Sequence, residues 1–196
     1  MFSQIKWENR LKGNNRSNCK VSVDGTDFRI PQQSERKVYY SHKFKKSGYR
    51  YEVALCIATG EIVWTNGPYP CGAYPDINIF RRALKGMLRQ VNEKALADLG
   101  YRGEKDFINT PNPYDSEVVV KLKKDAGMRH ETVNKRLKQF GALKQTFRHS
   151  KIKHQAVFNA CATLVQMEII AKEPLYQVQY GKLPLRALRG NRRNGH

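Results

Sequence analysis

The sequence lacks the features of several common protein classes. No apolar run approaches the roughly 20 residues needed to cross a bilayer, and Met1–Arg10 contains no apolar segment of the signal-peptide type. The four cysteines form no CxxC pair, and neither they nor the five histidines have the spacing of a zinc site. We therefore expect a protein with no membrane segment, in a reducing compartment that is nuclear in a eukaryote and cytoplasmic otherwise.

Acidic residues are also scarce. The chain of 196 residues has 36 Lys and Arg against 17 Asp and Glu, for a formal charge of +19, and no acid occurs from Thr132 to Met167. Such a charge favours binding to a polyanion through phosphate contacts and counterion release. We predict DNA as the partner. A basic RNA-associated protein is an alternative reading, although the sequence carries no aromatic-rich RNP motif.

The hydrophobic pattern predicts strands followed by helices. An apolar run over Val21–Ile30 predicts a first strand, and Tyr49–Ala58 with Glu61–Thr65 predicts a hairpin that turns at Thr59-Gly60. The further elements expected are a helix over 77–91, a short strand over Glu93–Ala97, and helices over 130–145 and 151–171; Ser116–Leu122 suits either a strand or a helix start. This order predicts an α/β fold, a mixed sheet with helices packed on it.

Three acidic residues stand where a metal-dependent nuclease would need them. Asp24 and Asp98 end two of the expected strands, and a glycine closely follows each, which lets backbone or ligand approach. Glu131 is expected to begin a basic helix that carries Lys135 and Lys138 on the same face. Carboxylates are the ligands that Mg²⁺ and Mn²⁺ prefer. A lone surface carboxylate is usually structural, so this hypothesis depends on all three meeting at one place.

The other acids receive different interpretations. Asp27 is expected to point away from Asp24 and at most to support it, and Asp76 is expected to cap the helix that follows. The remaining acids considered are Asp115 and Asp125, interpreted as turn residues, and Glu104 and Asp106, placed in a loop after Asp98 with no identifiable partner.

Three short motifs then resemble a known family. Val21–Phe28 resembles the first-aspartate motif of the DDE superfamily endonucleases, especially the Harbinger-type transposases, and Ala97–Tyr101 resembles their second motif. Arg129–Phe140 resembles the third, and the 33 positions from Asp98 to Glu131 suit the family's short final interval. One departure is Ala97, where many relatives have glycine. The resemblance covers about residues 20–180.

The resemblance implies an RNase H-like fold with a five-stranded mixed sheet flanked by helices. It also implies Asp24, Asp98 and Glu131 as catalytic residues and ligands of two Mg²⁺ or Mn²⁺ ions, acting in endonucleolytic cleavage and strand transfer of a DNA transposon. The expected organisation is an N-terminal arm over 1–20, the catalytic domain over 21–180 and a basic tail over 181–196.

Basic residues after the third motif are expected to hold the DNA backbone: Lys135, Lys138, Lys144, Arg148, Lys151 and Lys153. Members of the family usually carry a helical DNA-binding region ahead of the first aspartate, whereas only about 20 residues precede Asp24. We therefore expect a separate DNA-binding subunit or an upstream domain, together with homo-oligomerisation. The alternative is a domesticated or truncated transposase-derived protein that binds DNA without catalysis.

Overall fold

The fold is built on a mixed six-stranded sheet, seen in a computed structural model that describes residues 4–13, 17–173 and 175. The strands run in the order β2-β3-β1-β5-β6, and β4 also pairs with β3. Their bounds are β1 Cys19–Arg29, β2 Tyr40–Ser41, β3 Lys46–Cys56, β4 Ile62–Pro70, β5 Lys94–Leu96 and β6 Ile108–Asn109. β3 pairs antiparallel with both β1 and β4, whereas β5 lies parallel to β1 and β6 parallel to β5. The expected RNase H-like α/β fold is confirmed, and the two-residue β2 brings the expected five strands to six.

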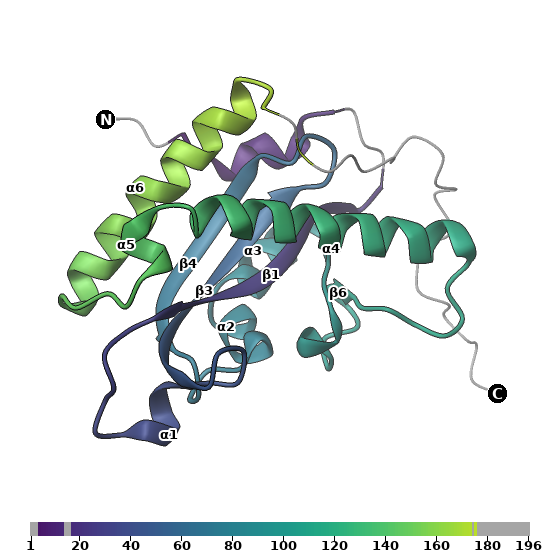
Figure 1. Cartoon of the computed structure of the whole chain (residues 1–196). Coiled ribbons are helices and arrows are strands. Elements are labelled where there is room, and N and C mark those ends of the chain that lie inside the picture. Colours follow the sequence, from purple (N-terminus) through teal and green to yellow (C-terminus); the bar gives the residue numbers. More distant parts are fainter. Residues whose placement is uncertain (1–3, 14–16, 174, 176–196) are drawn as a thin grey trace.

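Helices cover both faces of this sheet. They are α1 Arg36–Tyr39, α2 Asp76–Arg82, α3 Leu84–Val91, α4 Glu117–Leu137, α5 Gly141–Lys144 and α6 Lys151–Ile170, with short 3₁₀ helices η1 at Trp7–Leu11 and η2 at Leu99–Tyr101. Figure 1 shows α4 and α6 in front of the strands and α2 and α3 behind them. The molecule is therefore a three-layer α/β/α structure.

The alternation of side chains along β1 supplies both cores. Phe28 packs in one cluster with α4 and α6, which contribute Val133 and Phe158. Val23 packs in the second cluster, on the opposite face, with Leu84 of α3. Because successive residues of a strand point to opposite faces, the residues of β1 in phase with Phe28 face the α4 layer. Asp24 is one of them.

Helix α4 corrects two expectations. It begins at Glu117 and runs for 21 residues, so Glu131 lies well inside the helix and does not begin it. Val119, Leu122 and Ala126 form a buried stripe against the sheet at helical spacing, and this packing carries the helix straight through Gly127. The segment that suited either a strand or a helix start is thus the first part of α4.

Two smaller differences have local causes. Asp125 is buried within α4 and is not a turn residue. The single helix expected over 77–91 is divided at Ala83, whose φ of −142° and ψ of −66° lie outside the helical region, so that α2 and α3 each bury their own residues.

The remaining expectations on the chain's organisation have mixed outcomes. The hairpin of β3 and β4 and the helix α6 are confirmed. Among the described helices, none combines the length and the apolar character that a membrane crossing requires. The division into arm, domain and tail stays a prediction, and the tail over 181–196 lies outside the described residues.

Candidate active site

The parallel pairing of β1 and β5 brings Asp24 and Asp98 to one edge of the sheet. In this pairing Ser22 lies opposite Leu96. Asp24 lies two residues after Ser22, and Asp98 lies two residues after Leu96. Because the strands are parallel, both aspartates lie just beyond the same end of the β1–β5 pairing. The expectation that these two residues terminate adjacent strands is met for Asp98, whereas Asp24 lies within β1, which continues to Arg29.

The carboxylate of Asp24 is held on both oxygens. Its Oδ1 accepts a hydrogen bond of 2.7 Å from the Gly25 amide, and its Oδ2 accepts one of 3.3 Å from Asn134 Nδ2 of α4. The residue is half-buried. These two contacts orient the Asp24 carboxylate between its own turn and helix α4.

Asp98 is the N-cap of η2. Its Oδ1 accepts a hydrogen bond of 2.8 Å from the Gly100 amide, and the residue is exposed in the turn that follows β5. Tyr101, the last residue of η2, is buried against Phe80 in the core cluster beneath. The short helix therefore fixes the position of Asp98 through a buried anchor three residues away.

Helix α4 is fastened across the end of β1 by residues that flank Glu131. His130 Nε2 lies 2.9 Å from Ser22 Oγ, and Arg129 Nη1 donates a hydrogen bond of 2.7 Å to the carbonyl of Ile57. Burial lowers the pKa of His130 below its ordinary value, which keeps the ring neutral near pH 7. Glu131 itself is exposed, one helical turn before Asn134.

All three predicted acids line one cleft. The cleft has a volume of about 670 Å³ and is bordered by Asp24, Asp98 and Glu131. Basic side chains from two parts of the chain, Arg102 and Lys124 among them, line the same space. Within residues 4–13, 17–173 and 175, however, no three Asp, Glu, His or Cys side chains lie close enough together to hold a single metal ion. The acids thus share a cleft but are not gathered within the reach of one ion.

A further acid, Asp76, lies beside the two aspartate turns. The sequence predicts a helix cap here, but Asp76 is the first residue of α2 and makes no capping hydrogen bond, so that prediction is wrong. Its Oδ1 lies 3.4 Å from Arg50 Nη1. Burial raises the pKa of Asp76, Arg50 opposes that rise, and Asp24 adds to it. The Asp76 carboxylate therefore interacts electrostatically with Asp24, one of the three acids of the cleft.

Glu52 lies behind Asp76 on β3. It is 1% exposed, and its Oε2 accepts a hydrogen bond of 3.3 Å from Trp64 Nε1. Burial raises the pKa of Glu52 to about 8, so that the carboxyl group is mostly protonated at neutral pH. The sequence did not predict that Glu52 is buried. An acid within a mostly apolar strand is usually expected to face solvent.

Two further acids that the sequence brought into question have cationic partners. Asp27 is buried on the face opposite Asp24, where Arg50 donates hydrogen bonds of 2.7 and 3.0 Å to its two oxygens. Glu104 forms ion pairs of 2.7 Å with Arg81 and 2.9 Å with Lys85. Asp115, a fourth acid in the lining of the cleft, is also paired, with Lys123 at 2.7 Å.

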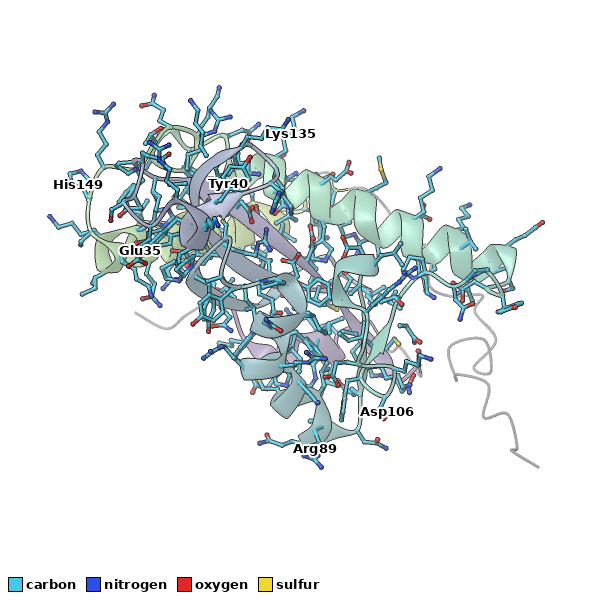
Figure 2. All side chains as sticks on the ribbon, turned by 90° about the horizontal axis from the view of Figure 1, so that it is seen from below. Glu35, Tyr40, Arg89, Asp106, Lys135 and His149 are labelled. Carbon is cyan, nitrogen blue, oxygen red and sulfur yellow. The ribbon has the colours of Figure 1, made fainter. Side chains whose placement is uncertain are left out.

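The basic residues expected to hold DNA are all at the surface. The exposed set comprises Lys135, Lys138, Lys144, Arg148, Lys151 and Lys153. They follow the chain from the end of α4, through α5, to the start of α6, and Figure 2 shows Lys135 projecting from α4. Lys138 is the most constrained of them: its Nζ lies 5.7 Å from the centre of the Phe28 ring, and partial burial lowers its pKa.

Sequence reasoning missed three residues of this region. His130 and Asn134 lie within the third motif, and their spacing from Glu131 places them on neighbouring positions of one helix. Their helical spacing could be recognised in the sequence, but it does not show that they contact Ser22 and Asp24 of β1. Lys43, whose Nζ donates a hydrogen bond of 2.6 Å to the carbonyl of Gly25, comes from the loop after β2 and gave no signal in the sequence.

One of the three comparisons with known proteins gives a match. The family model described as "Transposase DDE domain" matches residues 15–172, which include β1, β5 and α4. Neither a comparison with curated proteins nor one with solved structures gives a significant match. The match covers well over half of the chain, and the Harbinger subtype is not distinguished by it. The chain therefore belongs to the family of transposase DDE domains.

Proposed function

We propose that this chain is the catalytic domain of a DNA transposase, which cleaves DNA phosphodiesters and joins them by strand transfer with the help of divalent metal ions. Asp24, Asp98 and Glu131 are the catalytic residues of this proposal. The observation that carries it is their common cleft: residues 33 to 107 positions apart in the sequence line one space next to basic side chains.

The donor set suits Mg²⁺ or Mn²⁺. Three carboxylates offer hard oxygen ligands, and the amide of Gly25 and the side chain of Asn134 already orient one of them. The neutral His130 beside Glu131 adds no positive charge that would compete with a cation. When bound, the metal ions would lower the pKa of the attacking water or 3′-hydroxyl and stabilise the leaving oxygen.

The protein's own residues would position the substrate around these carboxylates. Lys124 and Arg102 line the cleft and would neutralise phosphates next to the scissile bond. The exposed basic residues from Lys135 to Lys153 would hold the DNA backbone away from the scissile bond. Such contacts carry no sequence information, so recognition of the transposon ends is assigned to another domain or subunit.

The test is a plasmid nicking assay with Mn²⁺, with and without chelator. The wild-type protein should convert supercoiled plasmid to open circles only when Mn²⁺ is free. Asp98→Ala should abolish nicking and leave salt-sensitive DNA binding nearly intact, because the substitution leaves every basic residue proposed to contact phosphate in place. Nicking by this variant at the wild-type rate would end the catalytic assignment.

One observation favours a second candidate, a transposase-derived protein that binds DNA without cutting it. Among the described residues, the three acids are not close enough together to hold one ion. This candidate predicts tight, salt-sensitive DNA binding and no nicking at any Mn²⁺ concentration. The same assay therefore separates the two functions.

A further inference from the structure

The two aspartate turns share a neighbour. A Cβ atom on Gly25, the residue after Asp24, would overlap Asp76 Oδ1 and lie 2.9 Å from Asp76 Cγ. A Cβ atom on Gly100 would lie 3.3 Å from Asp76 Oδ2 and 3.0 Å from Asp98 Oδ1. One carboxylate thus fills the space that both glycines leave open. The position of Asp76 therefore excludes a side chain at Gly25, and together with Asp98 it narrows the space at Gly100.

These contacts also fix how close the carboxylates are. Because Asp76 Oδ2 and Asp98 Oδ1 lie 3.3 and 3.0 Å from the same point, they are no more than about 6 Å apart. The amides of the two turns are engaged by Asp24 and Asp98 themselves. Asp76 therefore adds a negative charge next to the proposed ligands without taking their hydrogen bonds.

A place in the first turn of α2, where the helix dipole favours an acid, and an ion pair with Arg50 account for only part of this arrangement. Asp76 makes no capping hydrogen bond to α2. Its contact with Arg50, at 3.4 Å, is long, whereas Asp27 binds the same guanidinium through bonds of 2.7 and 3.0 Å and already neutralises it. Asp76 Oδ1 is buried with no hydrogen-bond partner among the described residues.

A second buried group lies within the electrostatic influence of the same acids. The hydroxyl of Tyr101 has no hydrogen-bond partner in the part of the chain that the structure describes, and the residue is 1% exposed. The acids that act on it electrostatically are Glu52, Asp76, Asp24 and Asp98. A buried hydroxyl without a partner costs stability, and so does repulsion among neighbouring carboxylates, which a bound cation would offset.

We propose that Asp76 is a fourth acidic residue of the catalytic centre, a positioning residue that sets the turns of Asp24 and Asp98 and adds its charge to the field that attracts the divalent ion. This inference rests on the proposed function. It differs from the DDE triad in assigning a role to α2, an element on the opposite face of the sheet from α4 (Figure 1).

The first test measures Mn²⁺ binding without DNA, from the electron paramagnetic resonance signal of free Mn²⁺. Asp76→Asn keeps the volume of the side chain and removes its charge, so a loss of affinity cannot be attributed to a cavity. We expect a loss of about 10–100-fold, the range typical of residues that support metal ligands. Affinity equal to that of the wild-type protein would overturn the proposal.

A double-mutant cycle tests the contact itself. Gly25→Ala would push the Asp76 carboxylate out of its place, so we expect it to weaken Mn²⁺ binding about as much as Asp76→Ala does. In the double variant, the shortened side chain at position 76 leaves room for the new methyl group, and the affinity should be no lower than that of Asp76→Ala alone. Fully additive losses would show that the two positions act independently and would refute the contact.

The matched control is Asp106→Asn. Asp106 is an exposed acid whose removal changes the net charge equally, and it lies at the end of the molecule away from Lys135 and α4 (Figure 2). Its variant should bind Mn²⁺ like the wild-type protein. If Asp76→Ala fails to fold, which its circular dichroism spectrum would show, Asp76→Asn alone decides the question.

The failure of this inference differs from the failure of the proposed function. If Asp24→Asn weakens Mn²⁺ binding and Asp76→Asn does not, only the role of Asp76 is refuted. If neither variant changes Mn²⁺ binding, both this role and the metal centre itself are refuted.

Discussion

Removing the side chain of Asn134 should slow DNA cleavage without abolishing it. Asn134 Nδ2 donates a hydrogen bond of 3.3 Å to Asp24 Oδ2, and no other contact across the cleft joins α4 to Asp24 among the hydrogen bonds of the described residues. Asn134→Ala breaks this link. The Gly25 amide still holds Oδ1 at 2.7 Å, so Asp24 loses one of two restraints.

The expected size of the effect follows from the geometry. A hydrogen bond to a charged group is worth about 1.5–3 kcal/mol, and a separation of 3.3 Å is longer than the usual range of roughly 2.7–3.2 Å for an N–H donor, which places this bond at the lower end. About 1.5 kcal/mol corresponds to roughly a tenfold change in rate. We therefore expect Asn134→Ala to cut about tenfold more slowly.

The assay is single-turnover nicking of supercoiled plasmid with Mn²⁺ and saturating protein. Asn159→Ala, at an exposed position of α6, is the matched control and should cut at the wild-type rate. A rate for Asn134→Ala within twofold of wild type would refute the reasoning, because Asp24 would then need no restraint from α4. A loss beyond a thousandfold would refute it as well, since it would make Asn134 part of the chemistry.

Three further predictions concern pH and salt. Burial lowers the pKa of His154 to about 4 from an ordinary 6.5, so the unfolding free energy should fall by roughly 3 kcal/mol as the pH drops through that interval, and urea titrations should show a flatter pH dependence for His154→Gln. Burial raises the pKa of Glu52 to about 8 from 4.5, so the opposite sign applies: stability should fall as the pH rises from 4.5 to 8, and Glu52→Gln should remove that loss in the same titrations. Replacing Lys135 and Lys151 together by Ala should make the plot of log affinity for DNA against log salt shallower by about 2, measured by fluorescence anisotropy, and an unchanged slope would exclude both from the phosphate contacts.

The local elements of the chain were largely predictable, and their ends were not. The strand that carries Asp24 and the hairpin after it follow from alternation and from the turn at Thr59-Gly60. The start of α4 did not, because Gly127 and the polar residues near it suggest a boundary. The buried stripe that includes Leu122 overrides that local preference.

The candidate site was predictable only in part. The convergence of Asp24, Asp98 and Glu131 on one cleft agrees with the resemblance to the DDE motifs, whereas their role in catalysis stays a prediction. Asp76 was misjudged because its place before an apolar helical pattern is typical of a cap. Its actual neighbours are two glycines, 51 residues before it and 24 residues after it, and no local pattern encodes such contacts.

The unbroken course of α4 has a mechanical consequence. At roughly 1.5 Å per residue its 21 residues span about 31 Å, and the hydrogen-bonded backbone makes it a stiff rod. Its first two-thirds wall the cleft, and its last turns carry exposed lysines, so neither part can shift without the other. Under the proposed function, binding of DNA at the C-terminal end of this helix would therefore be coupled rigidly to the position of Glu131, about two-thirds of the way along it.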